Sequence, residues 1–519
     1  MKSSEARRIL TGLAAALAAI ALAACGGGGG GGSTSAGGGG GGQTITQQIA
    51  ACEQGLGTTN PGTYANQMPV LLDGGPCAYF TPSGASSASV QQVGSLNQPF
   101  TTVTVCVPGA AQGSNSCLTV DHVLIDTGSF GLRLVSDPNN STTSSFLASL
   151  PGVTVSGSQV YECAPFASGV SWGSVRSADI YIGGEKSTAL APIGGVSIHV
   201  IGDSEGNIPG ACTSQAAGGT TQDTVDTLSA NGVLGVGLFL SDCGSTCTTS
   251  GNSFYFNCPS SGCVSAGVPA SQQVANPVSF FGADNNGVIL SIGALASGSG
   301  AVTLSGTLTF GINTQSGSST EAANQTAASL NAYLADQCGN FSTFITSLNG
   351  TAIANSDPIN ATQGTNCAST TVVQASLSFI DSGSNGVFFP IPSGTSGNTI
   401  ATSDIPSSCS SCSWYTPATT AAVGTSIIDY AGTPIAVPFT VQNADTLSNL
   451  NGGNDNVLAG LAAPSSSVGN VAGTDWGVPF FFGRPVYVAF EAIAPAGALN
   501  TISFPTSPVT SYNGPFWAF

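Results

Sequence analysis

A short acidic motif occurs twice in this sequence, and its two copies lie a domain length apart. Val123-Leu-Ile-Asp-Thr-Gly-Ser129 recurs as Leu377-Ser-Phe-Ile-Asp-Ser-Gly-Ser384, with the two aspartates 255 residues apart. Each copy is an apolar, strand-like run that ends in a turn of small and polar residues. A period of this length predicts two related halves around an approximate two-fold axis and excludes a solenoid of short repeats.

The remainder of the chain is predicted to be mainly β. Abundant glycine and β-branched residues, with 41% apolar residues, favour many short strands joined by turns over disorder. Thr320 to Asp336, rich in Ala and Leu and followed by Gly339, is the one segment predicted to be helical. The alternating segments that predict strands are Pro99–Cys106 and Cys117–Ile125 as a hairpin, 173–201, 287–293 and 301–312.

The charge balance excludes one class of function. Charged residues make up 6% of the chain, with 7 Lys and Arg against 25 Asp and Glu, which gives a net charge of −18. Proteins that bind nucleic acid need basic patches to neutralise phosphates. We therefore expect no nucleic-acid partner.

The N-terminus has the pattern of an export signal. Lys2, Arg7 and Arg8 precede an apolar run, Ile9 to Ala24, which is short for a membrane-spanning helix. Leu22-Ala-Ala-Cys25 resembles the lipobox of bacterial lipoproteins, which implies lipidation of Cys25 and a membrane anchor there. Gly26 after the cysteine points by the same resemblance to the outer membrane, and hence to the bacterial cell envelope. The alternative is an ordinary signal peptide that contains a cysteine.

These observations predict four regions. Residues 1–24 form the signal peptide, and residues 25–60 contain the lipidated cysteine and a flexible Gly-rich tether. Residues 61–296 form the N-terminal lobe and residues 297–519 the C-terminal lobe.

The cysteines agree with export. Of the 15 cysteines, Cys25 is set aside for lipid, and an even number remains for an oxidising compartment. Close spacings at Cys106/Cys117, Cys243/Cys247, Cys258/Cys263 and Cys409/Cys412 suggest local crosslinks on hairpins and loops, with the pairing left open. The last pair also has the spacing of redox and zinc motifs, but no second such motif accompanies it, which favours disulfides.

The repeated motif and its neighbours resemble the pepsin-like aspartic peptidases. Ile125 to Val135 is similar to the first active-site segment of that family, and Phe379 to Asn385 to the second. Three further segments follow the family in order: 231–237, 287–293 and 476–490. The resemblance implies a bilobal β fold in which Asp126 and Asp381 share one proton and activate a water.

The same resemblance implies roles for the residues around the two aspartates. Thr127 and Ser382 would brace the loops across the axis, Gly128 and Gly383 would donate backbone hydrogen bonds, and Ser129 and Ser384 would steady the outer carboxylate oxygens. No metal or organic cofactor is implied.

Two departures from the family stand out. A flap hairpin over the cleft is expected within 161–184, with Tyr161, Phe166 and Trp172 as its candidates for contacting substrate, yet the position of the usual flap tyrosine holds Pro165 or Phe166. Behind the second aspartate, Gly477-Val-Pro479 is expected to replace the usual apolar-apolar-Gly segment.

Three functions are compatible with these residues. The leading hypothesis is a membrane-anchored aspartic endopeptidase acting on polypeptide. The alternatives are a catalytically inactive binding module of the same fold, which takes a peptide ligand, glycan or partner protein at the cell envelope, and a purely structural surface protein. The segments Gly514-Pro-Phe-Trp-Ala-Phe519 and Pro479-Phe-Phe-Phe-Gly-Arg484 also resemble an uncharacterised lipoprotein family of proteobacteria, with no established activity.

Overall fold

A computed structural model describes most of the chain beyond its N-terminal region. The described residues are 43–59, 62–82, 85–166, 168–187, 194–203, 208–215, 220–327, 330–335, 339–353, 378–390, 400, 402–404, 413–465, 473–493, 498–504 and 511–519. The predicted signal peptide, Cys25, the Gly-rich tract of residues 26–42 and the pair Cys409/Cys412 lie outside them. Within these ranges no helix has the length and apolarity needed to cross a membrane.

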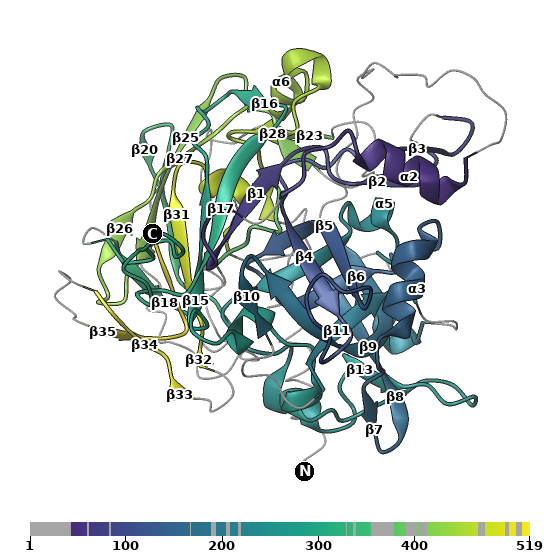
Figure 1. The fold of residues 1–519 in the computed structure, drawn as a ribbon. Helices are drawn as coiled ribbons and strands as arrows, with labels where there is room; N and C mark the ends of the chain where they lie inside the picture. Colours follow the sequence, from purple (N-terminus) through teal and green to yellow (C-terminus); the bar gives the residue numbers. More distant parts are fainter. Residues whose placement is uncertain are drawn as a thin grey trace, which may run out of the picture.

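The chain is mainly β, as its composition predicts, and most strands of the first half belong to one large sheet (Figure 1). This 17-stranded sheet contains β1 (Gln67–Leu72), β4 (Pro99–Cys106), β5 (Cys117–Asp126), β6 (Phe130–Val135), β7 (Thr154–Val155), β8 (Ser158–Phe166), β9 (Gly169–Ile182), β10 (Glu185–Lys186), β11 (Val196–Ile201), β12 (Gly232–Val236), β13 (Tyr255–Asn257), β14 (Val264–Ser265), β15 (Gly287–Ile292), β17 (Leu304–Phe310), β18 (Ala332–Leu334), β31 (Pro485–Ala489) and β36 (Phe516–Ala518).

Smaller sheets make up most of the second half. A four-stranded sheet contains β21 (Phe379–Ile380), β22 (Val387–Phe389), β29 (Ala462–Pro464) and β30 (Asp475–Trp476), and a five-stranded sheet contains β19 (Thr343–Leu348), β20 (Thr351–Ala352), β25 (Ala421–Ile428), β26 (Pro434–Ala436) and β27 (Phe439–Val441). The two-stranded pairs are β2 (Cys77–Phe80) with β3 (Ser89–Gln92), β16 (Gly300–Ala301) with β28 (Val457–Leu458), β23 (Thr402–Asp404) with β24 (Ser413–Tyr415), β32 (Ala492–Ile493) with β33 (Ala498–Leu499), and β34 (Thr501–Ser503) with β35 (Ser511–Asn513).

The α-helices of the described residues are short. They are α2 (Ile45–Glu53), α3 (Ser141–Ser149), α4 (Gly210–Thr213), α5 (Val225–Leu228) and α6 (Ala444–Ser448). Figure 1 shows α2 and α3 on the outside of the purple-to-blue half, and α6 at the far edge of the green half. The centre of the molecule is therefore built from strands.

The two halves repeat one arrangement of four strands. In the first half β5 runs parallel to β12, β12 antiparallel to β6, and β6 parallel to β11. In the second half β21 runs parallel to β30, β30 antiparallel to β22, and β22 parallel to β29. The repeat of the acidic motif is thus a repeat of topology, which confirms the prediction of two related halves.

The core is continuous across the halves. One cluster of buried apolar side chains includes Ile125 and Leu234 from the first four-strand unit and Ile380 and Trp476 from the second. Strands β15 and β17, on either side of the lobe boundary predicted at 296/297, pair with each other. That boundary stays a prediction, but burial of this shared apolar surface holds the two acidic turns in a fixed relation.

The helix predicted from Thr320 to Asp336 is wrong for its described residues. They contain β18 and no helix. The side chain of Asn66, distant in sequence, accepts a hydrogen bond from the N–H of Ala322 at 2.8 Å, and the side chain of Asn324 bonds backbone groups of the preceding loop. The first bond fixes the backbone of Ala322, and the Asn324 bonds hold the stretch against the preceding loop. Together they outweigh the weak helix propensity of Ala and Leu.

Five disulfides crosslink the described residues. Cys106–Cys117, Cys243–Cys247 and Cys258–Cys263 are local disulfides at three of the four close spacings, which confirms that such spacings mark local crosslinks. Cys52–Cys77 and Cys163–Cys212 close longer loops, and their spacing in the sequence does not indicate that they pair.

Candidate active site

The first acidic turn lies at the end of a strand with a second strand behind it. β5 ends at Asp126, and Gly235 of β12 is its partner in the parallel register. Asp126 is 2% exposed. Its Oδ1 accepts hydrogen bonds from the N–H of Gly128 at 2.8 Å and of Ser129 at 3.2 Å, and its Oδ2 accepts one from the Ser129 hydroxyl at 2.6 Å. Three donors thus stabilise a negative charge on this carboxylate.

The second turn repeats this pattern. β21 ends one residue before Asp381, which is fully buried. The carboxyl Oδ1 of Asp381 accepts a hydrogen bond from the N–H of Gly383 at 2.7 Å, and Oδ2 accepts one from the Ser384 hydroxyl at 2.8 Å. The turn residues Gly and Ser therefore make equivalent bonds in both halves.

Reciprocal hydrogen bonds join the two turns. The Thr127 hydroxyl donates to the carbonyl of Ile380 at 3.0 Å and accepts from the N–H of Ser382 at 2.9 Å. The Ser382 hydroxyl donates to the carbonyl of Ile125 at 2.6 Å and accepts from the N–H of Thr127 at 3.1 Å. Each turn supplies the same groups to the other, as an approximate two-fold axis between them requires.

The turns approach each other so closely that both need glycine. A Cβ atom on Gly128 would lie 2.7 Å from Cγ of Asp381, and one on Gly383 would lie 2.9 Å from Cγ of Asp126. Both distances are shorter than van der Waals contact allows, so any larger residue would push the carboxyl groups apart. Glycine at these positions permits the meeting of the two aspartates.

The two carboxyl groups interact directly. Burial raises the pKa of Asp381 well above its ordinary range, and the charge of Asp126, the charge of Asp475 and a side-chain hydrogen bond to Asp126 raise it further. Two carboxyls in this position cannot both ionise cheaply, so the pair retains a proton. The structure thus brings together all eight residues predicted for the centre of the site: Asp126, Thr127, Gly128, Ser129, Asp381, Ser382, Gly383 and Ser384.

A third acidic residue lies next to the pair and was missed by the sequence reasoning. The strand behind Asp381 is β30, Asp475–Trp476, so the segment that takes this place is Asp-Trp-Gly and not Gly477-Val-Pro479. Val478 to Phe480 instead form a single 3₁₀ turn. The expected segment therefore begins two residues too late along the chain. The available signal was an aspartate two residues before Gly477.

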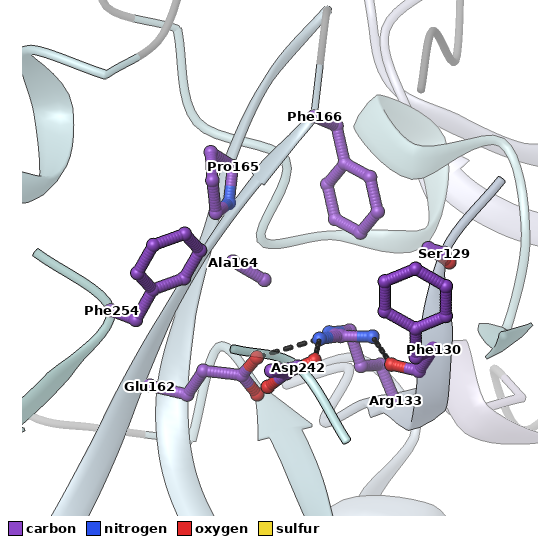
Figure 2. A pocket seen from close by; sticks show the side chains of 9 residues that line it. All are labelled: Ser129, Phe130, Arg133, Glu162, Ala164, Pro165, Phe166, Asp242 and Phe254. Atoms are coloured by element: carbon purple, nitrogen blue, oxygen red, sulfur yellow. Dashed lines mark hydrogen bonds and ion pairs between the residues drawn. The ribbon is translucent and has the colours of Figure 1, made fainter. Parts of the chain in front are cut away.

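The predicted hairpin is present, but its three candidate residues for contacting substrate lie in two different places. β8 and β9 pair antiparallel across their whole facing length. Phe166 lines a pocket beside Ser129, with Phe130 and Phe254 as further aromatic walls (Figure 2). Tyr161 and Trp172 stack on each other, with ring centroids 5.7 Å apart, in a separate cluster with the Cys163–Cys212 disulfide. Of the three residues, Phe166 alone lines this pocket.

Buried charges form one side of the same pocket. The guanidinium of Arg133 donates to Glu162 at 2.7 Å and to Asp242 at 2.5 Å, and its other terminal nitrogen donates to the carbonyl of Phe130 (Figure 2). Asp242 also accepts a hydrogen bond from the Tyr255 hydroxyl. These residues come from β6, β8, β13 and a loop, and nothing in their separate sequence contexts indicates that they meet.

Other groups with ligand chemistry lie outside this site. Glu185, Asp284 and Glu321 bring one carboxylate oxygen each within 4.8 Å of one another. Such acidic groups are common without an ion. His122 in β5 bonds Asp73 at 3.2 Å, and His199 in β11 is fully buried beside Glu162, so both are interior strand histidines.

Comparison with known proteins gives a family but no activity. The sequence model of a family described as "Protein of unknown function (DUF3443)" matches residues 83–519. No curated protein matches the chain. Among solved structures, the crystal structure of aspartic proteinase from Irpex lacteus matches at 14% identity and a TM-score of 0.38, covering 77% of this chain and 96% of that one. A TM-score this low bears on neither mechanism nor substrate.

Proposed function

The chain belongs to the family described as "Protein of unknown function (DUF3443)", so we propose its function from the geometry of its site: hydrolysis of peptide bonds by Asp126 and Asp381 acting on a water held between them. The observation that carries this proposal is the direct contact of two buried carboxyls, presented by equivalent turns that the Thr127 and Ser382 hydroxyls join to each other.

The surroundings of the two carboxyls suit one to be charged and the other to be protonated. Asp126 accepts three hydrogen bonds and is therefore suited to carry the negative charge, while burial and Asp126 raise the pKa of Asp381, which holds the shared proton. The charged carboxylate removes a proton from the water as its oxygen attacks the scissile carbonyl carbon. The protonated carboxyl donates its hydrogen to the carbonyl oxygen. Breakdown of the tetrahedral species returns a proton to the leaving amine, so that water is added across the peptide bond.

The pocket beside Ser129 supports a polypeptide as the substrate. Phe130, Phe166 and Phe254 give it apolar walls next to the hydroxyl that bonds Asp126. An extended peptide chain passing the two carboxyls would place a side chain against these rings. Apolar walls with a few fixed polar groups are typical of sites that bind organic ligands.

We also propose export to the cell envelope, with lipid attachment at Cys25. Five disulfides in the described residues support an oxidising compartment. Because the leader and Cys25 lie outside the described residues, this part of the proposal depends on the sequence pattern.

The test is hydrolysis of an unfolded protein substrate between about pH 3 and pH 7. Asp126→Asn and Asp381→Asn are expected to lower kcat/KM at least about 1,000-fold, because each removes one of two groups that transfer protons. Asp445→Asn is the matched control, since Asp445 is exposed on α6. A thermal melt of each variant separates loss of chemistry from loss of fold. Wild-type rates in both dyad variants would exclude the proposal.

A second candidate function is a binding module without catalysis. The observation that favours it is Asp475, whose carboxyl bonds the same Ser384 hydroxyl as Asp381 and so alters the surroundings of the pair. This candidate predicts that a statine-type peptide, whose hydroxyl mimics the tetrahedral species, binds with no cleavage of any peptide. Calorimetry on wild type and Asp381→Asn distinguishes the two functions when combined with the hydrolysis assay.

A further inference from the structure

Ser384 connects the aspartate pair to a third carboxyl. Its hydroxyl oxygen lies 2.8 Å from Oδ2 of Asp381 and 2.6 Å from Oδ2 of Asp475. Asp475 is fully buried, so water does not screen it from its neighbours. Asp126, Asp381 and Asp475 therefore form a continuous row, with direct contact on one side and a hydroxyl bridge on the other.

Hydrogen counting restricts the protonation of this row. A serine hydroxyl has one hydrogen, and an ionised carboxylate only accepts. If the hydroxyl donates to Asp381, the bond to Asp475 needs a proton on Asp475; if it donates to Asp475, the bond to Asp381 needs a proton on Asp381. Both short contacts are hydrogen bonds only when at least one of the two carboxyls is protonated.

The surroundings of Oδ1, the second carboxyl oxygen of Asp475, favour the protonated form of this residue. Oδ1 of Asp475 is buried and has no hydrogen-bond partner within the described part of the chain. Burying an ionised carboxylate with an unbonded oxygen is strongly unfavourable, whereas burying a neutral carboxyl in that place is much less so. In agreement, burial raises the pKa of Asp475 well above its usual range.

The arrangement occurs in one half of the molecule only. Phe379 pairs with Asp475 in the second half, and the equivalent pair in the first half is Leu124 with Val233. Val233 is buried and apolar, so the position beside Asp126 that is equivalent to Asp475 holds no acid. The fold does not require an acid at this position. Asp475 is therefore a feature that this chain adds to a symmetrical scaffold.

Asp475 faces apolar side chains and the two aspartates of the pair. β30 pairs with β21 and β22, whose facing residues Phe379, Ile380, Val387 and Phe388 are apolar. Within the part of the chain that the structure describes, the titratable groups that interact with Asp475 electrostatically are Asp126 and Asp381. A change in the charge of Asp475 therefore acts mainly on the protonation of the Asp126–Asp381 pair.

We propose that Asp475 is a positioning residue that joins the Asp126–Asp381 pair through the Ser384 hydroxyl, so that the three carboxyls gain and lose protons as one unit. The inference rests on the proposed function for its meaning in catalysis. A protonated Asp475 orients the Ser384 hydroxyl toward Asp381. When Asp475 ionises, its charge makes the pair hold the shared proton more tightly, which extends the active form to higher pH.

The test measures the titration of the pair with and without an ionisable group at position 475. In the full-length chain with carboxyl-¹³C aspartate, Asp475→Asn is expected to move the upper titration midpoint of the pair to lower pH by about one unit. Asparagine keeps the size of the side chain and can still donate to Ser384, but it carries no charge. The alkaline limb of kcat/KM against pH is expected to move by the same amount and in the same direction.

Controls separate coupling from a structural role. Asp445→Asn, at an exposed position on α6, should leave both the midpoint and the limb unchanged. Asp475→Leu, close in size and also uncharged, gives the same shift and serves if the asparagine variant folds poorly. If Asp475→Asn lowers the rate at every pH but moves neither the alkaline limb of kcat/KM nor the titration midpoints of the pair, the inference is overturned. A moved midpoint in a chain that cleaves no peptide would sustain the inference and reject the proposed peptidase activity.

Discussion

Arg133 is the residue on which the charged side of the pocket depends. Replacing it with methionine keeps much of the volume but leaves Glu162 and Asp242 buried without their cation. We expect Arg133→Met to lower the free energy of unfolding at pH 7 by about 3–5 kcal/mol, as measured by urea denaturation. Because burial raises the pKa of Glu162, which binds a proton more readily still when the cation is absent, the loss should shrink as the pH falls toward 5.

Lys186 gives the matched comparison at this scale. Its ammonium lies 3.5 Å from Asp179, and its side chain is 39% exposed. Lys186→Met should therefore cost less than about 1 kcal/mol, because solvent screens an exposed ion pair. Equal losses for the two variants would mean that burial of the Arg133 cluster contributes nothing.

At the residue level, the sequence predicts the centre of the site because its groups are contiguous. Each Asp-Thr/Ser-Gly-Ser turn carries its own donors, so Asp126 and Ser129 already lie within bonding distance in any such turn. The Arg133, Glu162 and Asp242 cluster joins three segments, and Asp475 meets Ser384 across 91 positions. Contacts of this kind depend on tertiary packing, which one sequence does not reveal.

The β8–β9 hairpin depends on a disulfide that spans a long loop. Cys163 in β8 bonds Cys212 in α4, 49 residues away, and both are fully buried. Loop-closure entropy predicts that Cys163→Ser with Cys212→Ser lowers the free energy of unfolding by about 4 kcal/mol. The same double change at Cys258 and Cys263, only 5 residues apart, should cost about 2 kcal/mol. Thermal and urea unfolding of both variants provides the comparison, and a larger loss for the short loop would contradict the entropic account.

At the element level, local pattern predicted strands and failed for the helix. The alternation in 99–106 and 117–125 predicts the β4–β5 hairpin because strand pairing across a turn is a local interaction. The Ala- and Leu-rich stretch from 320 has no equivalent constraint. The backbone N–H and carbonyl of Ala322 bond the side chain of Asn66, and β18 within the stretch pairs with β36 near the C-terminus. Partners this distant decide the structure of a segment whose own propensity is weak.

For the whole molecule, titratable groups predict highest stability in mild acid. Burial, with Asp121, raises the pKa of Glu53 to about 7, and burial raises that of Asp223 to about 6. His122 is raised to about 9: burial lowers its pKa, but bonds to Asp121 and Asp73 outweigh this. All three bind protons more tightly in the folded chain than in the unfolded one. Their stabilisation is complete below the unfolded pKa and is lost as pH rises through the folded value.

The free energy of unfolding should therefore fall as pH rises from about 4.5 to about 9, with the carboxyls acting below about 7 and His122 above 6.5. The net charge of −18 adds self-repulsion, which also lowers stability as the pH rises.

Glu53→Gln removes one of these titratable groups. The decrease in the free energy of unfolding between about pH 4.5 and 7 should therefore become smaller by on the order of 1 kcal/mol, after allowance for solvent screening of a half-buried group. Asp445→Asn, which changes the net charge equally at an exposed position, should leave the slope nearly as it is. A melting temperature that rises from pH 5 to pH 8 in the wild-type chain would show that other groups dominate, because each of the three groups named here requires the opposite sign.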